Sequence, residues 1–163
     1  QYLEELKFIL NEINKKDEEV IGEDYYEWEI NNWNELTSTK YSPIFKAGNY
    51  EWKLCIYPNG KNDEEYISLY LYSESASNIN ENSYISTKYI MTIRNHNNYS
   101  CFKYKRSENL LHFTKENTQY GESKYLHKND LYKKNNNFKG LIEDNTIIIG
   151  AYIRVYKSEI KNK

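Results

Sequence analysis

The stretch that decides the fold class lies in the middle of the chain and reads Tyr66-Ile67-Ser68-Leu69-Tyr70-Leu71-Tyr72. The apolar residues at 67, 69 and 71 alternate with serine and tyrosine, and this period of two is typical of a β-strand with one buried face. If the three aliphatic residues face a core, Tyr70 faces away from it. An outward tyrosine offers contact area at a small entropic cost together with a polar hydroxyl, so Tyr70 is a candidate binding residue.

The same alternation occurs elsewhere along the chain, in residues 26–31, 52–57 and 147–156. Further strands are expected near 86–94, 100–105 and 109–115. Turn-forming residues separate the candidates, such as Pro58-Asn59-Gly60 ahead of the stretch quoted above. About eight strands linked by turns predict an all-β protein, built as an antiparallel sandwich.

Residues 1–20 show a different pattern, which predicts one N-terminal helix. Leu3, Leu6, Leu10 and Ile13 recur at alternating spacings of three and four, without proline or glycine between them. Two interpretations stay open, a coiled-coil segment or a short helix packed on its own domain. Asp17 interrupts the apolar seam, which leaves fewer clean heptads than the ~3–4 of a sustained coiled coil. We expect the helix or coiled-coil remnant to span 1–21 and a single domain to span 22–158.

Composition excludes several classes of protein. The 163 residues fit one domain, and no apolar run approaches the ~18 residues that cross a membrane. The net charge of −2 and the isoelectric point of about 6.0 argue against a nucleic-acid-binding surface. The first residues lack the basic and apolar regions of a signal peptide, so we expect a cytoplasmic or nuclear protein. Because 18 residues are tyrosines, the core is expected to include some of them.

No residue pattern indicates catalysis, a cofactor or a metal. The three histidines at 96, 112 and 127 show none of the spacings of zinc ligands, and the acidic runs lack the spacing of a calcium loop. Cys55 and Cys101 fall in predicted strands, without a neighbour in sequence that would lower a thiol pKa. We therefore expect a protein that is not an enzyme.

Five segments, in order, resemble the MATH domain family, the meprin and TRAF homology family. They are residues 26–33 (YEWEINNW), 41–54 (YSPIFKAGNYEWKL), 56–60 (IYPNG), 67–71 (ISLYL) and 140–147 (GLIEDNTI). The resemblance covers about residues 24–157 at the family's spacing. Among the subfamilies, the chain is most similar to the amino-terminal domain of ubiquitin-specific proteases of the herpesvirus-associated type, and next to the speckle-type POZ adaptors.

The resemblance implies an eight-stranded, TRAF-like antiparallel sandwich whose exposed edge strand binds short linear peptides by β-augmentation. The family's edge-strand motif falls on Gln119-Tyr120-Gly121-Glu122, followed by Ser123, and its other pocket positions fall on Tyr70, Tyr89 and Leu111. Gln119 and Glu122 stand where the family carries Asp and Phe. These departures imply either a ligand with Lys or Arg facing Glu122 or a loss of peptide binding.

We accordingly expect a non-catalytic domain that recruits substrates in a ubiquitin-handling protein of the deubiquitinase type. Its partners would be short linear peptides of other proteins, with no nucleic acid and no membrane, and self-association through residues 1–20 stays open. One alternative is an oligomeric scaffold of the TRAF type assembled by that N-terminal helix. Another is a carbohydrate-binding sandwich, suggested by the 16% aromatic content.

Overall fold

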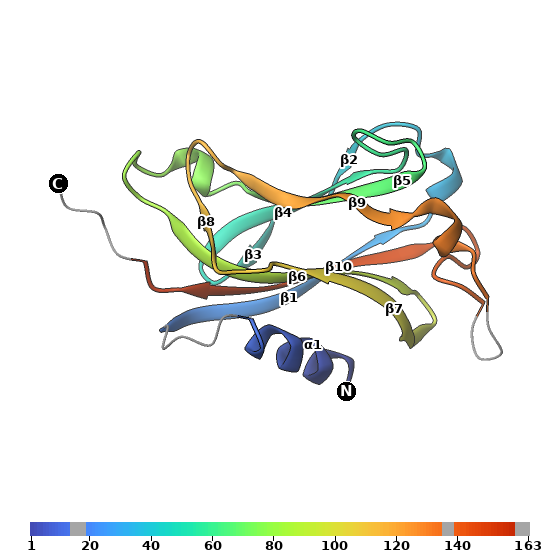
Figure 1. Ribbon diagram of the computed structural model, residues 1–163, viewed down its shortest axis with the longest axis horizontal. Helices are drawn as coiled ribbons and strands as arrows, with labels where there is room; N and C mark the ends of the chain where they lie inside the picture. The colour runs from blue at the N-terminus through green and yellow to red at the C-terminus, as the bar shows by residue number, and fades with distance from the viewer. Residues whose placement is uncertain (14–18, 135–138, 159–163) are drawn as a thin grey trace.

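Two β-sheets packed face to face form the body of the protein, and helix α1 (Tyr2–Asn11) lies against the outer face of one of them (Figure 1). The computed structural model describes residues 1–13, 19–134 and 139–158. The strands in this part of the chain are β1 (Val20–Ile30), β2 (Lys40–Tyr41), β3 (Phe45–Ala47), β4 (Tyr50–Tyr57), β5 (Tyr66–Ser73), β6 (Ile85–Asn95), β7 (Asn98–Arg106), β8 (Leu111–Phe113), β9 (Gln119–His127) and β10 (Ile147–Tyr156). Short 3-10 helices connect some of them, namely η1 (Trp33–Glu35), η2 (Ala76–Asn78) and η3 (Lys128–Leu131).

The eight strands that the sequence predicts are all present, and the all-β sandwich is confirmed. The additional strands β2 and β3 are two and three residues long, too short to show a period of two in the sequence. Both pair with β4 and extend its sheet. The two additional strands therefore leave the fold class and the two-sheet arrangement unchanged.

Every strand pairing is antiparallel, and the order of the strands leaves β9 at an edge. The first sheet runs β1-β10-β6-β7, with β8 paired to β6. The second sheet runs β2-β4-β5-β9, with β3 paired to β4. β9 therefore has one paired side, toward β5, and one side without a partner strand in the described part of the chain.

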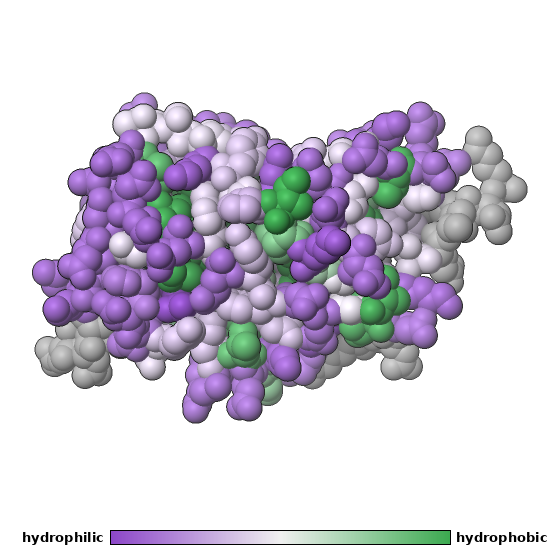
Figure 2. All heavy atoms as spheres, turned by 180° about the vertical axis from the view of Figure 1, so that it is seen from behind, coloured by the Kyte–Doolittle hydropathy of each residue, from purple (hydrophilic) through white to green (hydrophobic). Residues whose placement is uncertain are grey.

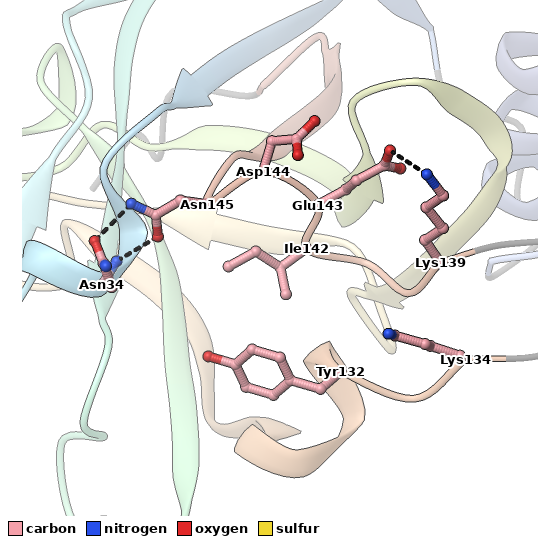
Figure 3. Close-up of a pocket in the computed structure, with 8 residues that line it drawn as sticks. All are labelled: Asn34, Tyr132, Lys134, Lys139, Ile142, Glu143, Asp144 and Asn145. Atoms are coloured by element: carbon pink, nitrogen blue, oxygen red, sulfur yellow. Dashed lines mark hydrogen bonds and ion pairs between the residues drawn. The ribbon is translucent and has the colours of Figure 1, made fainter.

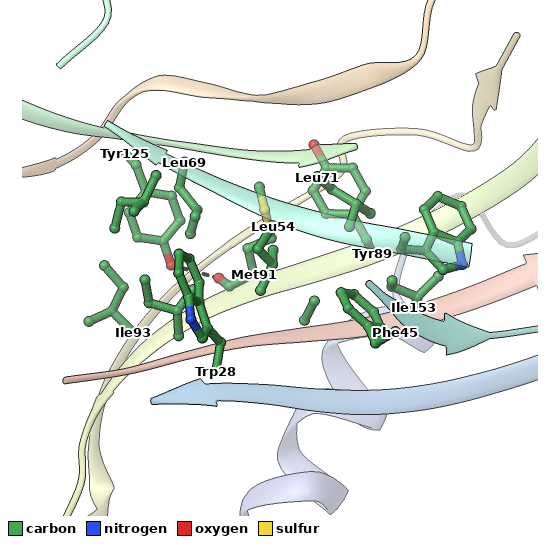
Figure 4. Packing of buried hydrophobic residues seen from close by; sticks show 14 of the residues in the cluster. Trp28, Phe45, Leu54, Leu69, Leu71, Tyr89, Met91, Ile93, Tyr125 and Ile153 are labelled. Carbon is green, nitrogen blue, oxygen red and sulfur yellow. Dashed lines mark hydrogen bonds between the residues drawn. The ribbon is translucent and has the colours of Figure 1, made fainter. Parts of the chain in front are cut away.

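The core between the sheets consists of the alternating apolar residues of the strands. Ile67, Leu69 and Leu71 of β5 are fully buried, and Trp28 and Trp52 belong to the same cluster. Figure 4 shows Leu69, Leu71 and Trp28 packed together in the space between the sheets. Full burial of one such side chain is worth about 1.5–3 kcal/mol, so the alternation fixes which face of each strand turns inward.

Helix α1 packs on the outer face of the first sheet, as the second of the two interpretations expects. Its buried residues Tyr2, Leu6 and Leu10 form one cluster with Ile90 of β6 and Tyr152 of β10. The first sheet is therefore covered on both faces along these strands. The apolar side of the helix is occupied by the chain's own sheet.

The helix is shorter than the predicted 1–20. It ends at Asn11, and Val20, which the heptad pattern places in the helix, is the first residue of β1. Leu3 lies outside the buried side and is 42% exposed. Asp17 falls outside the described residues. The prediction of the helix end was wrong because the apolar spacing continues to Ile13, which is buried in the same cluster although it lies beyond the helix.

Polar contacts hold both ends of the helix on the sheet. The ammonium group of Lys88 donates to the carbonyl oxygen of Ile13 at 2.6 Å, and the guanidinium group of Arg154 donates to the Asn11 side chain at 2.7 Å. The Tyr2 hydroxyl donates to the Thr92 hydroxyl at 2.8 Å. These bonds satisfy buried polar groups that would otherwise cost free energy. No helix in the described part of the chain is long and apolar enough to cross a membrane.

We expect Leu6→Ala to lower the free energy of unfolding by about 2–5 kcal/mol, because the side chain is fully buried between the helix and the sheet. Leu3→Ala is the matched control and should change it by about 0.5 kcal/mol or less. Chemical denaturation measures both, and light scattering measures the mass in solution. A loss of mass in Leu6→Ala without a loss of domain stability would instead assign the helix to an oligomer.

Candidate functional site

The free side of β9 is the feature from which the candidate site is built. Residues directly opposite each other in an antiparallel pair project to the same face of the sheet. In the pairing with β5, Tyr120 lies opposite Leu71 and Glu122 lies opposite Leu69. Since both leucines face the core, Tyr120 and Glu122 point toward the opening between the two sheets. The backbone on the unpaired side of the strand remains available to another extended chain.

Gly121 and Tyr70 form the outer side of the site. They lie opposite each other in the pairing of β9 with β5. A Cβ atom on Gly121 would lie 2.6 Å from the Tyr70 Cα and 2.8 Å from its ring carbon Cδ1, and would also overlap the carbonyl oxygen of Leu69. The ring of Tyr70 therefore lies across the glycine, which explains why a residue without a side chain occupies this position.

Other groups hold the ring of Tyr70 in this position. The ring meets the ring of Tyr57 edge to face at 5.8 Å between centroids, and the Lys61 ammonium group lies 5.0 Å from its centroid. Burial raises the pKa of the Tyr70 hydroxyl, and the charge of Glu122 adds to the effect. The hydroxyl thus remains a neutral donor at physiological pH.

Tyr120 is anchored on the core at the other side of the strand. Its ring meets Phe113 edge to face at 4.8 Å between centroids, and its hydroxyl donates to the carbonyl oxygen of His112 at 2.8 Å. Leu111, at the start of β8, is half-buried against the same core cluster. Edge-to-face ring pairs contribute about 0.5–1.5 kcal/mol beyond their burial, so Tyr120 is held before any ligand arrives.

Tyr89 lies beneath this surface rather than on it. The residue is on β6, is 4% exposed and belongs to the core cluster between the sheets (Figure 4). Burial raises its pKa, with added contributions from the charges of Glu122 and Tyr120. The structure thus brings Tyr89 close to the predicted site as its floor, without offering its ring to a ligand.

Gln119 and Ser123, the two ends of the predicted peptide-binding segment, both contact β5. Gln119 lies opposite Tyr72 at the start of the pairing, and both side chains are half-buried. The carbonyl oxygen of Ser123 accepts a hydrogen bond of 2.6 Å from the Ser68 hydroxyl, where the pairing of β9 with β5 shifts its register. The regular edge at the candidate site therefore runs from Gln119 to Glu122.

Tyr125 is a residue of the site that sequence reasoning missed. It is buried, and its hydroxyl donates to the carbonyl oxygen of Met91 on β6 at 2.6 Å and approaches that of Lys103 on β7 at 3.4 Å (Figure 4). The bond joins the edge strand to the opposite sheet. Strict alternation from Glu122 would turn Tyr125 outward. Between Glu122 and Leu126, however, three residues of β9 lie opposite the single residue Ser68 of β5, and Tyr125 turns inward in this irregular stretch.

The two cysteines and the metal-binding residue types in the described ranges do not form a recognisable catalytic or metal centre. Cys55 and Cys101 are buried, and burial raises the pKa of both thiols, the opposite of what a cysteine nucleophile requires. No group of histidine, cysteine and acidic residues in the described ranges is placed to hold a metal ion.

A hollow of about 410 Å³ lies elsewhere, beside η1 and the loop before β10 (Figure 3). Two pairs of its polar residues interact with each other. The backbone N–H of Asn34 donates to the Asn145 side chain at 2.8 Å, and Lys139 and Glu143 form an ion pair of 3.8 Å. These contacts fix the loop, so the free side of β9 is the better candidate for binding.

In the part of the chain that the structure describes, the surface face drawn in Figure 2 shows no large apolar patch that would suggest a binding site other than β9. Figure 2 shows that, on the face turned to the viewer there, hydrophobic residues form small separate patches among polar ones. Single exposed apolar residues are ordinary on protein surfaces. A large apolar patch, which often marks a protein interface, is not seen on that face among the described residues.

We expect Gly121→Ala to destabilise the domain by about 1–3 kcal/mol, because the new methyl group meets the backbone of β5 and the ring of Tyr70. Ser123→Ala, two residues along the same strand, is the control and should cost less. Thermal and chemical denaturation compare the two. Equal stability of Gly121→Ala and the wild type would show that Tyr70 does not lie across the strand.

Comparison with known proteins adds sequence and structural relatives. A family model of the MATH domain matches residues 25–153. The chain is 30% identical over 138 residues to a TNF receptor-associated factor family protein of Dictyostelium discoideum, in a match that covers 81% of this chain and 28% of that protein. It is 26% identical over 135 residues to ubiquitin C-terminal hydrolase 13 of Arabidopsis thaliana, covering 81% of this chain and 11% of that protein. In structure it is similar to Notothenia coriiceps TRAF5, with a TM-score of 0.58 and 12% identity over 85% of this chain and 76% of that one.

The chain thus spans less than a third of the length of these two sequence relatives. It corresponds to the MATH part of such proteins and does not include a protease domain. The family match and the fold agree with the motifs, the two antiparallel sheets and the edge strand described above. The chain belongs to the MATH domain family, a family of non-catalytic protein-interaction domains found in TRAF proteins and ubiquitin-specific proteases.

Proposed function

We propose that this domain binds an extended peptide segment of a partner protein along the free side of β9. The observation that carries the proposal is the regular, unpaired edge over Gln119–Glu122, flanked by the anchored rings of Tyr70 and Tyr120. An edge strand supplies backbone donors and acceptors that any peptide can use, so it determines the path of the ligand more than its sequence.

Specificity would come from the side chains beside that edge. Successive side chains of an extended peptide point to opposite faces. On one face they meet Tyr120, Glu122 and Leu111, and on the other they meet Tyr70 across Gly121. Tyrosines that are already held by neighbouring groups lose little entropy when they bind, which suits them to this role.

Glu122 gives the site a charge preference. It is half-buried and points toward the opening between the sheets, and no ion pair joins it to another described residue. A lysine or arginine of the peptide would supply the missing partner. Peptide binding with a basic residue at this point is therefore the form of the function that the residues favour.

The biological role that we propose is recruitment of substrates to a longer protein that handles ubiquitin. The support is the similarity to ubiquitin C-terminal hydrolase 13 of Arabidopsis thaliana. In such a parent the domain would bind the partner, and a catalytic domain elsewhere in the chain would act on it. Assembly through helix α1 is less favoured, because its apolar side already packs on the first sheet.

We expect Tyr120→Ala to weaken binding of a peptide selected on the wild-type domain by about tenfold or more, since it removes a ring from the middle of the site. Tyr41→Ala is the control, because Tyr41 lies on β2 at the other end of the same sheet. Isothermal titration calorimetry measures both affinities. Equal affinities for Tyr120→Ala and the wild type, with a folded variant, would contradict the proposal.

A further inference from the structure

A groove between β7 and β9 continues the candidate site past Glu122. It has a volume of about 380 Å³, and the residues that line it include Lys103 and Lys105 from β7 and Lys124, Tyr125 and His127 from β9. The groove lies in the opening between the two sheets, on the side where β9 has no partner strand. Any peptide that follows the free side of β9 beyond the tyrosines reaches this groove.

Lys103 and Lys105 occupy unusual positions on their strand. They pair with Ile93 and Met91 of β6, whose side chains are buried in the core. The two lysines are thus on the core-facing side of β7, and they are exposed only because β7 is an edge strand. Inward-pointing charged residues protect an edge strand against pairing with another sheet. Acidic residues would give the same protection, so protection alone does not explain why both residues are lysines.

The charges of the groove do not balance. Among the described residues, no ion pair joins Lys103, Lys105 or Lys124 to an acidic group. The acidic residue of the groove, Asp130, already pairs with Lys133 at 2.6 Å. The ammonium groups of Lys103 and Lys105 therefore have no acidic partner among the described residues, and that of Lys124 lies 5.4 Å from the centroid of the Tyr66 ring.

The order of charges along the opening follows from the positions of the residues on their strands. Glu122 lies two residues before Lys124 on β9, and Tyr125, the next residue, bonds to Met91, the partner of Lys105. Met91 and Ile93, the partners of Lys105 and Lys103, are two residues apart on β6, about 7 Å at the usual rise of a strand. A bound peptide would pass one negative charge and then a set of positive ones.

We propose that the groove binds carboxylate side chains of the same peptide that occupies the free side of β9. The ligand class is then an extended peptide with a basic residue at Glu122 and one or more acidic residues about two to four positions away. This inference rests on the proposed peptide binding and adds the charge pattern of the ligand. The bond of Tyr125 to β6 holds the two walls of the groove in place, so the lysines face the ligand without a rearrangement.

The test is selection from a random-peptide library on the wild-type domain and on two double variants. Lys103→Glu with Lys105→Glu reverses the charge of the groove. Lys7→Glu with Lys46→Glu makes the same change in net charge at exposed positions of α1 and β3. We expect enrichment of Asp and Glu on the wild type and on the control variant, and loss of that enrichment on the groove variant.

Synthetic forms of a selected peptide make the test quantitative. The acidic form should bind the groove variant about tenfold more weakly than the wild type, and its Gln-substituted form should bind both equally. Affinity of the acidic form should fall as salt is added. Glu122→Gln should remove the preference for Lys or Arg while keeping the preference for Asp and Glu.

The outcomes distinguish failure of the groove's role from failure of the proposed peptide binding along β9. If binding of the selected peptides depends on Tyr120 but the peptides are not enriched in Asp and Glu, the role of the groove is overturned and the peptide site on β9 stands. The same holds if the enrichment in Asp and Glu persists on the groove variant. Acidic peptides that bind equally to the wild type and Tyr120→Ala would place the ligand away from β9 and overturn both. Acidic enrichment that depends on Tyr120 and on the two lysines supports the inference.

Discussion

The pairing of β9 with β5 is the interaction on which the candidate site depends. Because the pairing is antiparallel and in register from Gln119 to Glu122, Leu69 and Leu71 place Glu122 and Tyr120 on the core side of the strand. The same register puts Gly121 under the ring of Tyr70. One set of backbone hydrogen bonds therefore positions both faces of the site and leaves the other side of the strand free.

The two sheets have different surroundings, and this difference determines where we propose that a peptide binds. The outer face of the first sheet is covered by α1, whose residues Leu6 and Leu10 pack on Ile90. The second sheet has no such helix in the described residues, and its edge β9 is held to the opposite sheet by Tyr125. The helix stabilises the domain on one side, and the edge strand presents the candidate site on the other.

Much of the fold could be predicted because alternation of apolar residues is a strong signal. The β5 stretch is predicted correctly, since burial of Ile67, Leu69 and Leu71 is worth more than any local preference. The helix is predicted too long, because the apolar spacing continues past its last residue, Asn11, to the buried Ile13. Strands of two or three residues such as β2 show no period, so they could not be found.

The edge strand β9 was predictable in position, and the surroundings of the residues near it were less so. The aromatic-glycine pair at Tyr120 and Gly121 marks the edge strand in the sequence, and the structure explains the glycine. Tyr89 could not be assigned to the core from its strand alone, because every residue of β6 is buried. Tyr125 could not be assigned to the site from the sequence, because it turns inward at an irregularity in the pairing of β9 with β5. The lysines of β7 could not be assigned either, because only the fold places them beside β9 in one groove.

Amide hydrogen exchange of β9, with and without a selected peptide, tests most directly whether the ligand adds to this edge. Successive N–H groups of a strand point to opposite sides, so a peptide on the free side should protect every second amide from 119 to 123. Protection in that alternating pattern is the result predicted here. Unchanged exchange over these residues, with protection at another part of the domain, would contradict it.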